Sequence, residues 1–587
     1  MSAPAPERPT AVIDFADDCG PRGRYTFRRP VEVVAADALE EVRPALRRVE
    51  RAAAGGLYAA GFVSYEAAPA FDRALAVRRK SDVPLLWFAL FDRPCDDPPA
   101  RAAGEFQLSP WEPSVGRGEY AGRVGDVRDA IARGDVYQVN YTFRLRALFR
   151  GDDLALYERL LAAQRTRHGA YLDAGRFRVL SASPELFFRR RGRALVTRPM
   201  KGTAPRGRWA GEDEERAARL AASEKERAEN LMIVDLLRND VGRVAGLGSV
   251  RVPELFRVER YPTVWQMTST VEGALRAGAG LEDVFAALFP CGSVTGAPKV
   301  SATRAIAALE DSPRGVYCGA AGFVAPGGDA AFNVAIRTVV LDCETGVAEY
   351  GVGGGVTWDS TAEGEYAEAL EKARLLAEAP RDFELLETLR LEDGRYALLE
   401  EHLARLSESA AYFDFPPPAG AARAALEGHA RLHPSGARRV RLLAPAGGGA
   451  RVESEELAEA PAGARPVALA LTPVSRADRF LFHKTTRRGV YDERRAERPG
   501  VFDVLLWNEE GELTEFTNGN VVVELDGRRW TPPRASGLLA GTFRAELLRG
   551  GEVAERVLTR ADLARASRLW LVNSVRGRVE VWVKDEG

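Results

Sequence analysis

The sequence has few cysteines, no long apolar run and almost no net charge. Its five cysteines include no C-x-x-C pair and no metal-ligand spacing, a sparse set that fits a reducing cytosol. No stretch approaches the roughly 18 apolar residues of a membrane helix, and the N-terminus has no secretory signal pattern. The 82 basic and 84 acidic residues give a net charge of -2, which provides no strong field for nucleic acid or anionic membrane. We therefore expect a cytoplasmic protein that binds neither.

Two domains are predicted. The 587 residues are ample for several cores, and the 46% hydrophobic and 28% charged fractions are ordinary for a globular protein. Apolar residues recur at helical spacing over residues 211–245, which predicts one long amphipathic helix. A helix ends near Pro380, and a strand pair follows with its turn at residues 392–394. We therefore predict domains at residues 1–379 and 380–587.

The first candidate for a chemical role is Lys201, in the stretch TRPMKGTAPR. A lysine beside glycine is usually a solvated surface residue, but burial in a partly apolar cleft would make it a nucleophile. Two glutamate pairs, Glu226 with Glu229 and Glu365 with Glu368, have a three-residue spacing that places each pair on one helix face. Each pair is either a solvated face or half of a site for a hard divalent cation.

Ordered motifs favour the functional interpretation of these residues. They are SASPE, PMKGT, KERAENLMIVDLLRND, CGSVTGAPK, NVAIRT, GVGGG and EYAEALEKA, all within about residues 115–378. Together they resemble the chorismate-utilising enzymes, which include anthranilate, isochorismate, salicylate and aminodeoxychorismate synthases. The resemblance implies chorismate as substrate and an α+β fold, an antiparallel β-sandwich with helices outside.

The same resemblance implies a metal site and a substrate site. Glu229 and Glu368 would bind Mg²⁺ directly, with Glu226 and Glu365 behind them. Glu185 would be the general acid for the departing ring hydroxyl. Lys299 has two open roles, structural or electrostatic. The implied substrate contacts are Arg337, Tyr317, Lys372, Gly353, Gly354, Gly355, Thr295, Gly296, Lys299 and Gln138.

Three positions bear on the type of reaction. Lys201 matches the aminodeoxychorismate synthases, whereas anthranilate synthases have alanine there. The match implies that its amine attacks ring carbon 2 of chorismate and that ammonia then displaces it, giving 4-amino-4-deoxychorismate. Gln138 replaces the lysine that activates water in isochorismate and salicylate synthases, which argues against both activities. Gln266 replaces a histidine that assists pyruvate loss in anthranilate synthases.

The sequence lacks a glutaminase pattern. None of its cysteines lies in G-x-C-x-G, and His168 is the only histidine before residue 380. We therefore expect a separate glutamine amidotransferase subunit to supply ammonia.

The second domain resembles the class IV aminotransferases through LLETLRLEDGRYALLEEHLARL, FLFHKTTRRGVYDE, GELTEFTNGN and LLAGTFRAELL. The resemblance implies a fold type IV α/β domain, pyridoxal 5'-phosphate as cofactor and a homodimer. Lys484 matches the lysine that bonds the cofactor, Glu515 the acid that faces its pyridine nitrogen and Arg405 the phosphate arginine. Gly541 and Thr542 would add phosphate donors. Singly, each would be an ordinary surface or turn residue.

The two resemblances together imply a bifunctional enzyme of 4-aminobenzoate synthesis, a folate precursor. The first domain would aminate chorismate, and the second would act as a lyase that eliminates pyruvate from the product. One alternative is an anthranilate synthase component I fused to a class IV transaminase. Another is a non-catalytic regulatory subunit that binds chorismate. Whether FVSYEAA, residues 62–68, forms a tryptophan pocket stays open.

Overall fold

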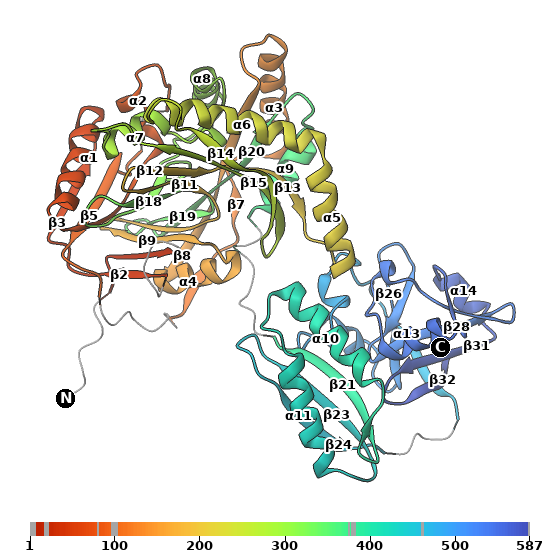
Figure 1. Ribbon diagram of the computed structural model, residues 1–587. Coiled ribbons are helices and arrows are strands. Elements are labelled where there is room, and N and C mark those ends of the chain that lie inside the picture. Colours follow the sequence, from red (N-terminus) through yellow and green to blue (C-terminus); the bar gives the residue numbers. More distant parts are fainter. Residues whose placement is uncertain are drawn as a thin grey trace. The chain divides into compact units, whose positions relative to one another are not determined.

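The computed structural model describes residues 8–16, 23–78, 81–95, 104–373, 376, 383–458 and 463–584 (Figure 1). The predicted domain border at residues 379/380 lies outside these ranges. The chain packs into two compact units. Unit 1 consists of Met1–Pro205 and Ala217–Pro380, and unit 2 of Arg206–Arg216 and Arg381–Gly587. The predicted domains assigned residues 206–216 to the first half, whereas the structure packs them with the second.

Unit 1 contains two ten-stranded antiparallel sheets. The first sheet has the strand order β16 (Gly296–Ala297), β8 (Gln138–Gly151), β20 (Val347–Val356), β19 (Thr338–Asp342), β10 (Phe177–Ser183), β9 (His168–Ala174), β1 (Ala11–Phe15) and β2 (Tyr25–Phe27). The short strands β6 (Phe106–Leu108) and β7 (Glu112–Pro113) also pair with β8. The long β8–β20 pair places residues 139–142 opposite residues 353–356, at the end of the sheet that carries the site.

The second sheet contains the strand of Lys201. Its order is β13 (Met200–Pro205), β15 (Val264–Ala274), β12 (Ala194–Arg198), β11 (Leu186–Arg191), β18 (Ala330–Val334), β17 (Ala320–Val324), β4 (Tyr58–Val63), β5 (Leu86–Phe91) and β3 (Glu32–Ala36). Strand β14 (Arg251–Arg260) pairs with the other edge of β15.

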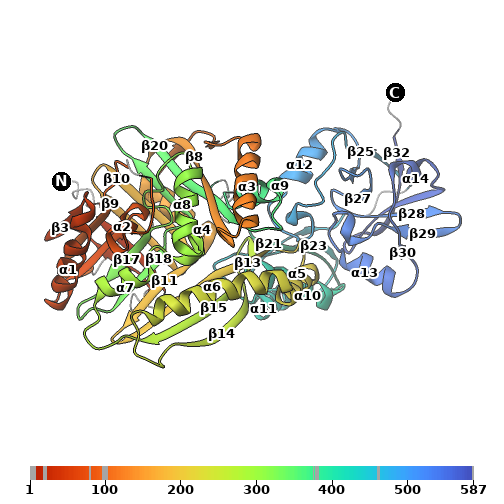
Figure 2. The same cartoon turned by 90° about the horizontal axis from the view of Figure 1, so that it is seen from above.

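Helices cover the outer faces of both sheets. Buried residues from both sheets, such as Ile13, Phe62 and Leu172, form one core between them. The second sheet packs against α1 (Leu39–Ala54), α2 (Ala68–Phe71), α6 (Glu224–Gly242) and α7 (Leu281–Leu288). The first sheet packs against α3 (Arg117–Ala132), α4 (Asp153–Gln164), α8 (Lys299–Leu309) and α9 (Ala362–Glu371). Figure 2 shows α6 running along β15 and β14. The predicted α+β sandwich with outer helices is confirmed.

The single helix predicted over residues 211–245 is wrong. The structure has two helices there, α5 (Ala210–Ala222) and α6, separated at Ser223. Ser223 has an extended backbone, and its hydroxyl accepts a hydrogen bond from the Glu226 N–H, as an N-cap does. Periodicity continued through this position, but the serine cap starts a new helix and so fixes the direction in which Glu226 and Glu229 point.

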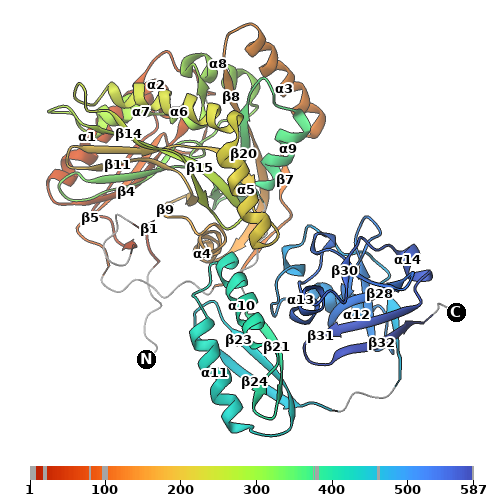
Figure 3. The ribbon, with the colours of Figure 1, turned by 45° about the vertical axis from the view of Figure 1, so that its right-hand side comes forward.

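Unit 2 is built on two further sheets. A four-stranded sheet has the order β22 (Arg395–Tyr396), β21 (Leu385–Glu392), β23 (Ala437–Ala444) and β24 (Arg451–Glu456). Helices α10 (Leu399–Phe413) and α11 (Ala419–Leu432) cover one face of it (Figure 3). The predicted strand pair at its start is present, with Asp393 and Gly394 at positive φ in the turn. Positive φ at both central residues suits a tight hairpin.

The eight-stranded sheet of unit 2 closes on itself. Its order is β27 (Leu513–Phe516), β26 (Asp503–Trp507), β25 (Arg465–Leu469), β32 (Gly577–Val583), β31 (Arg568–Asn573), β28 (Gly519–Leu525), β29 (Arg528–Thr531) and β30 (Ala554–Glu555). An additional β27–β28 pairing completes the ring. The helices of this part are α12 (Gly489–Ala496), α13 (Thr542–Arg549) and α14 (Arg560–Ala564). Within the part of the chain that the structure describes, no helix has the length and apolar character needed to cross a membrane.

Candidate functional site

Unit 1 contains a cavity of about 190 Å³ that collects most of the residues predicted for its site. The wall is formed mainly by β13, α6, β20 and α9, so the residues come from distant parts of the sequence. The predicted residues that line it are Glu185, Lys201, Glu226, Glu229, Gln266, Tyr317, Arg337, Gly353, Gly354, Gly355, Glu365, Glu368 and Lys372.

Lys201 lies in a strand bulge. The register of β13 against β15 shifts between Met200 and Thr203, and Gly202 has a φ of +96°. A bulge redirects the side chains around it, and here it places Lys201 on the cavity wall. The side chain is half-buried. Asn230 fixes the strand by donating to the Lys201 carbonyl oxygen at 3.1 Å.

Because Gly355 has no side chain, two polar groups can lie close to it. A Cβ built on this glycine would lie 2.3 Å from Gln138 Nε2 and 2.6 Å from Lys201 Nζ, so a side chain there would collide with both. Gln138 is 1% exposed, and among the described residues neither polar atom of its side chain has a hydrogen-bond partner. Such a buried group is costly unless something satisfies it. Gln138 therefore lies behind Gly355, next to the Lys201 amine, with bonding capacity to spare.

Four glutamates give the cavity its negative charge. Glu226 and Glu229 come from α6, and Glu365 and Glu368 from α9. Burial, together with a neighbouring glutamate, raises the pKa of Glu226, Glu229 and Glu365. The pKa of Glu368 is lowered, first by the charge of Lys372, whose Nζ lies 2.8 Å from Glu368 Oε1.

The chemistry of this carboxylate set is that of a site for the predicted Mg²⁺. Among the described residues, no three His, Cys, Asp or Glu side chains already converge at metal-ligand distances. Mg²⁺ commonly takes one or two protein carboxylates and completes its shell with substrate oxygens and water. Two glutamates from each of two helices line this one cavity, and the pKa of three of the four is raised partly by a neighbouring glutamate, so the set fits a divalent cation shared with an anionic substrate.

Glu185 faces the same cavity as a group able to carry a proton. It is 3% exposed, and burial raises its pKa to about 7, against the opposing effects of Ser293 and Lys201. Within the described ranges, its Oε1 has no hydrogen-bond partner. A carboxyl that still carries its proton near neutral pH can act as a general acid.

Four predicted substrate contacts are not among the residues that line the cavity: Thr295, Gly296, Lys299 and Gln138, the last of which lies behind Gly355. Lys299 Nζ lies 2.7 Å from Asp240 Oδ2 and donates to the Leu288 carbonyl oxygen, so its charge is used within the fold. The Thr295 hydroxyl donates to the Cys291 carbonyl oxygen at 3.1 Å. These contacts correspond to the structural alternative that the sequence left open for Lys299.

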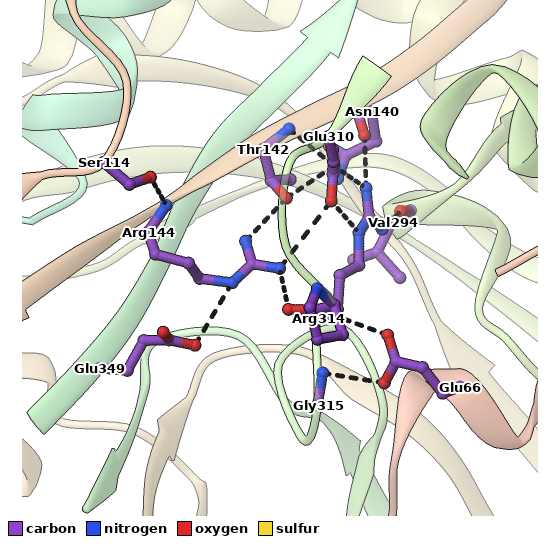
Figure 4. Close-up of polar contacts among 11 residues, drawn as sticks. Glu66, Ser114, Asn140, Thr142, Arg144, Val294, Glu310, Arg314, Gly315 and Glu349 are labelled. Carbon is purple, nitrogen blue, oxygen red and sulfur yellow. Dashed lines mark hydrogen bonds and ion pairs between the residues drawn. The ribbon is translucent and has the colours of Figure 1, made fainter. Parts of the chain in front are cut away.

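A buried charged network supports the cavity wall from behind (Figure 4). Arg314 donates to Glu310 at 2.6 Å and to the carbonyl oxygen of Asn140, a wall residue, at 2.7 Å. The Arg144 guanidinium lies 5.1 Å from the ring of Tyr317, another wall residue. Glu66, in FVSYEAA, accepts hydrogen bonds from the backbone N–H groups of Arg314 and Gly315, and burial raises its pKa to about 7. Through Arg314 the network holds the wall residues Asn140 and Val294 by charge-assisted bonds to their carbonyl oxygens.

Unit 2 contains a larger cavity, of about 740 Å³. All five residues predicted to hold the cofactor line it: Arg405, Lys484, Glu515, Gly541 and Thr542. Burial is the main cause that lowers the pKa of Lys484 to about 8, helped by the charges of Arg405 and Arg488. Burial also raises the pKa of Glu515 to about 7, although Tyr491 donates to its Oε1 at 2.8 Å.

The sequence interpretation missed the partners of Arg405. Glu387 accepts from Arg405 Nε at 2.9 Å and from Nη2 at 2.5 Å, and it also contacts His402 Nδ1 at 2.7 Å. Burial opposes ionisation of Glu387, but Arg405 and His402 together lower its pKa to about 2. His402 lies one helical turn before Arg405, and this spacing was the available signal. No sequence pattern indicated Glu387, because β21 and α10 come together only in the folded chain.

Comparisons with known proteins agree with this two-part architecture. A family model described as chorismate binding enzyme matches residues 8–378, and one described as amino-transferase class IV matches residues 384–582. Aminodeoxychorismate synthase component 1 of Salmonella typhimurium is 42% identical over 264 residues, 45% of this chain and 58% of that protein. Anthranilate synthase component 1 of Methanothermobacter thermautotrophicus is 40% identical over 257 residues, 44% of this chain and 55% of that protein.

A solved structure resembles unit 1. Anthranilate synthase component I from Streptococcus pneumoniae TIGR4 has a TM-score of 0.51 and 26% identity, covering 64% of this chain and 93% of that chain. The chain spans less than two thirds of the length of the curated relatives named above.

Proposed function

The chain belongs to the chorismate binding enzyme family, and from this we propose that unit 1 converts chorismate to 4-amino-4-deoxychorismate. The observation that carries the proposal is that the Lys201 amine faces the same cavity as Glu185 and the four glutamates. Synthases of both the aminodeoxychorismate and anthranilate types match this chain at similar identity. The choice between them therefore rests on Lys201.

The charged groups of the cavity suit a dicarboxylate substrate. Mg²⁺ bound by Glu229 and Glu368, with Glu226 and Glu365 behind them, would neutralise one substrate carboxylate. Arg337 and Lys372 would pair with the other, since a guanidinium can donate two parallel bonds to a carboxylate. Lys372 Nζ is held at the cavity wall between the Gly353 carbonyl oxygen and Glu368 Oε1, each at 2.8 Å.

Lys201 and Glu185 would then share the chemistry. Nucleophilic attack by the Lys201 amine forms a C–N bond at ring carbon 2 as the C–O bond at carbon 4 breaks. Glu185 gives its proton to the departing hydroxyl, which leaves as water. Ammonia forms a bond to carbon 4, the lysine C–N bond breaks, and Lys201 is regenerated. Gln138 carries an amide, which does not deprotonate water. This favours ammonia, and not water, as the second nucleophile.

We further propose that unit 2 consumes the product of unit 1 as a lyase. Its cavity fits pyridoxal 5'-phosphate, which would act as an electron sink. Arg405, Gly541 and Thr542 would hold its phosphate, and Glu515 would keep the pyridine nitrogen protonated. Lys484 would bond the cofactor and then move protons as pyruvate leaves, giving 4-aminobenzoate.

The proposed partner is a glutamine amidotransferase subunit that supplies ammonia. The similar relatives carry the name component 1, which implies a second component for them. A homodimer formed through unit 2 is proposed from the class IV resemblance alone.

The experiment is to supply chorismate and ammonium, with Mg²⁺ or with a chelator, and to identify the product. 4-Aminobenzoate that needs both Mg²⁺ and pyridoxal phosphate supports the proposal. Anthranilate would indicate the alternative synthase, accumulation of 4-amino-4-deoxychorismate a transaminase in unit 2, and absence of turnover a regulatory subunit. Glutamine replacing ammonium without any other protein would contradict the separate amidotransferase.

A further inference from the structure

An eleven-residue segment packs with unit 2, although over 160 residues of sequence separate it from the rest of that unit. Residues 206–216 lie within the range matched by the chorismate binding family model, yet they belong to the compact body of unit 2. They begin directly after β13, the strand of Lys201. Because the remainder of unit 2 starts at residue 381, this unit is discontinuous in sequence.

Buried polar contacts fix the start of the segment. Arg206 is 8% exposed and donates through Nε to both carboxylate oxygens of Asp213, at 2.8 and 2.9 Å. Its guanidinium lies 4.9 Å from the ring centre of Tyr412. The Tyr412 hydroxyl in turn donates to the Gly207 carbonyl oxygen at 2.6 Å. A buried, paired charge of this kind is costly to disrupt.

Aromatic packing fixes the middle of the segment. The Trp209 ring stacks on Phe482 with centroids 5.1 Å apart, and it packs against the apolar cluster that contains Leu481 and Phe482. The Arg208 guanidinium lies 5.1 Å from the Phe482 ring and donates to the carbonyl oxygens of Arg476 and Ala535. Stacked aromatic pairs contribute beyond the area that they bury.

The segment also holds one nitrogen of His483. His483 Nε2 lies 3.1 Å from the Arg208 carbonyl oxygen, and Nδ1 lies 3.0 Å from the Ser409 hydroxyl. Burial lowers the pKa of His483 to about 3, so the ring is neutral. A carbonyl oxygen only accepts, so Nε2 carries the proton and Nδ1 accepts from Ser409. The ring is further held by stacking on Tyr412, with centroids 4.3 Å apart.

His483 directly precedes Lys484 in the sequence. On the other side of Lys484, the backbone is fixed by contacts with β21. The Lys484 carbonyl oxygen accepts from the Leu386 N–H at 3.0 Å, and Thr485 bridges to Leu385. With His483 clamped, the backbone is constrained on both sides of the lysine. We propose that residues 206–216 complete unit 2 and, by holding His483, position Lys484 for its reaction. The positioning role rests on the pyridoxal phosphate function proposed above; the completion of unit 2 does not.

The test uses the full chain without cofactor. Lys484 labelling by a small amine-reactive reagent is measured against pH, and deuterium uptake is measured over residues 480–486. Trp209→Ala removes the stack, and His483→Phe removes both hydrogen bonds but keeps a ring. Because burial is the main cause of the low Lys484 pKa, loosening this region should raise the labelling midpoint from about 8 towards the ordinary lysine value. The expected rise is about 0.5–1 pH unit, with faster deuterium uptake.

Trp582→Ala is the matched control, because it removes a half-exposed tryptophan from β32 of the same unit. The control should change neither quantity. Wild-type values in both Trp209→Ala and His483→Phe would overturn the inference, as would equal changes in the control. Failure of the wild-type chain to bind pyridoxal phosphate would instead refute the proposed function, and the labelling and exchange results would still decide whether the segment completes unit 2.

Discussion

At the scale of single residues, the proposed amination at carbon 4 rests on Lys201. Replacement by alanine should lower ammonia-dependent consumption of chorismate by at least about 100-fold, because no covalent route remains. The conversion of supplied 4-amino-4-deoxychorismate by unit 2 should be unaffected. Mass spectrometry of quenched reactions should find a chorismate-derived adduct on the peptide of Lys201 in the wild type. An unchanged rate in Lys201→Ala would contradict covalent catalysis.

Glu185 gives unit 1 a dependence on pH. Its pKa of about 7 means that the carboxyl carries its proton below pH 7 and loses it above. In its proposed role as general acid it is active when protonated, so kcat/KM for chorismate should fall about tenfold per pH unit above 7 at constant free ammonia. Glu185→Gln should remove this limb and lower the rate by about 10²–10⁴-fold. A wild-type profile that stays flat from pH 6 to 9 would exclude the role.

Sequence alone could predict residue types at the site but not their partners. Lys201, Glu185 and the glutamates were found from motif order, and the fold brings them to one cavity. Lys299 was placed with them by the same reasoning, yet Asp240, 59 positions away, binds it instead. No local pattern reports such a pairing, because it depends on how α6 packs beside the start of α8.

At the scale of elements, the bulge in β13 determines where Lys201 points. Gly202→Ala would put a side chain at a φ of +96°, and its Cβ would lie 3.1 Å from Met267 Cβ and 3.2 Å from Glu226 Oε2. We expect a loss of about 1–2 kcal/mol of stability and up to about 100-fold of chorismate amination. Thermal unfolding and ammonia-dependent turnover would measure the two effects.

Gly192→Ala provides the control for the bulge. Gly192 lies between β11 and β12 at a φ of +54°, and nothing lies within 4 Å of an added Cβ. This variant should lose similar stability but keep its turnover. Equal turnover in Gly202→Ala and Gly192→Ala would show that the bulge does not orient the lysine.

Element boundaries show where periodicity is insufficient. The apolar pattern over residues 211–245 is continuous, so it predicted one helix, whereas Ser223 ends that continuity by capping α6. The first part, α5, has its N-terminal residues packed in unit 2. A periodic pattern shows which face of a helix is apolar, but it does not show which of the two units that face packs against.

At the scale of the whole molecule, stability of unit 1 depends on the charged network of Figure 4. Arg314 is 3% exposed and bonded to Glu310, and its backbone N–H donates to Glu66. Arg314→Met would leave Glu310 buried without its main partner, which typically costs about 3–5 kcal/mol. Denaturant unfolding should show this loss, whereas Arg238→Met, at an exposed ion pair with Asp235, should change little. A loss as small as that of the control would contradict the network's role.

The discontinuity of unit 2 has a consequence for how the gene can be divided. A polypeptide that begins at residue 381 lacks eleven residues of its own body, and the missing piece is encoded upstream of helix α6. Expressing the halves from separate messages would therefore leave the downstream product with an uncovered aromatic patch at Tyr412 and Phe482. When a chain folds in this way, cutting it at one position does not give two proteins that fold independently.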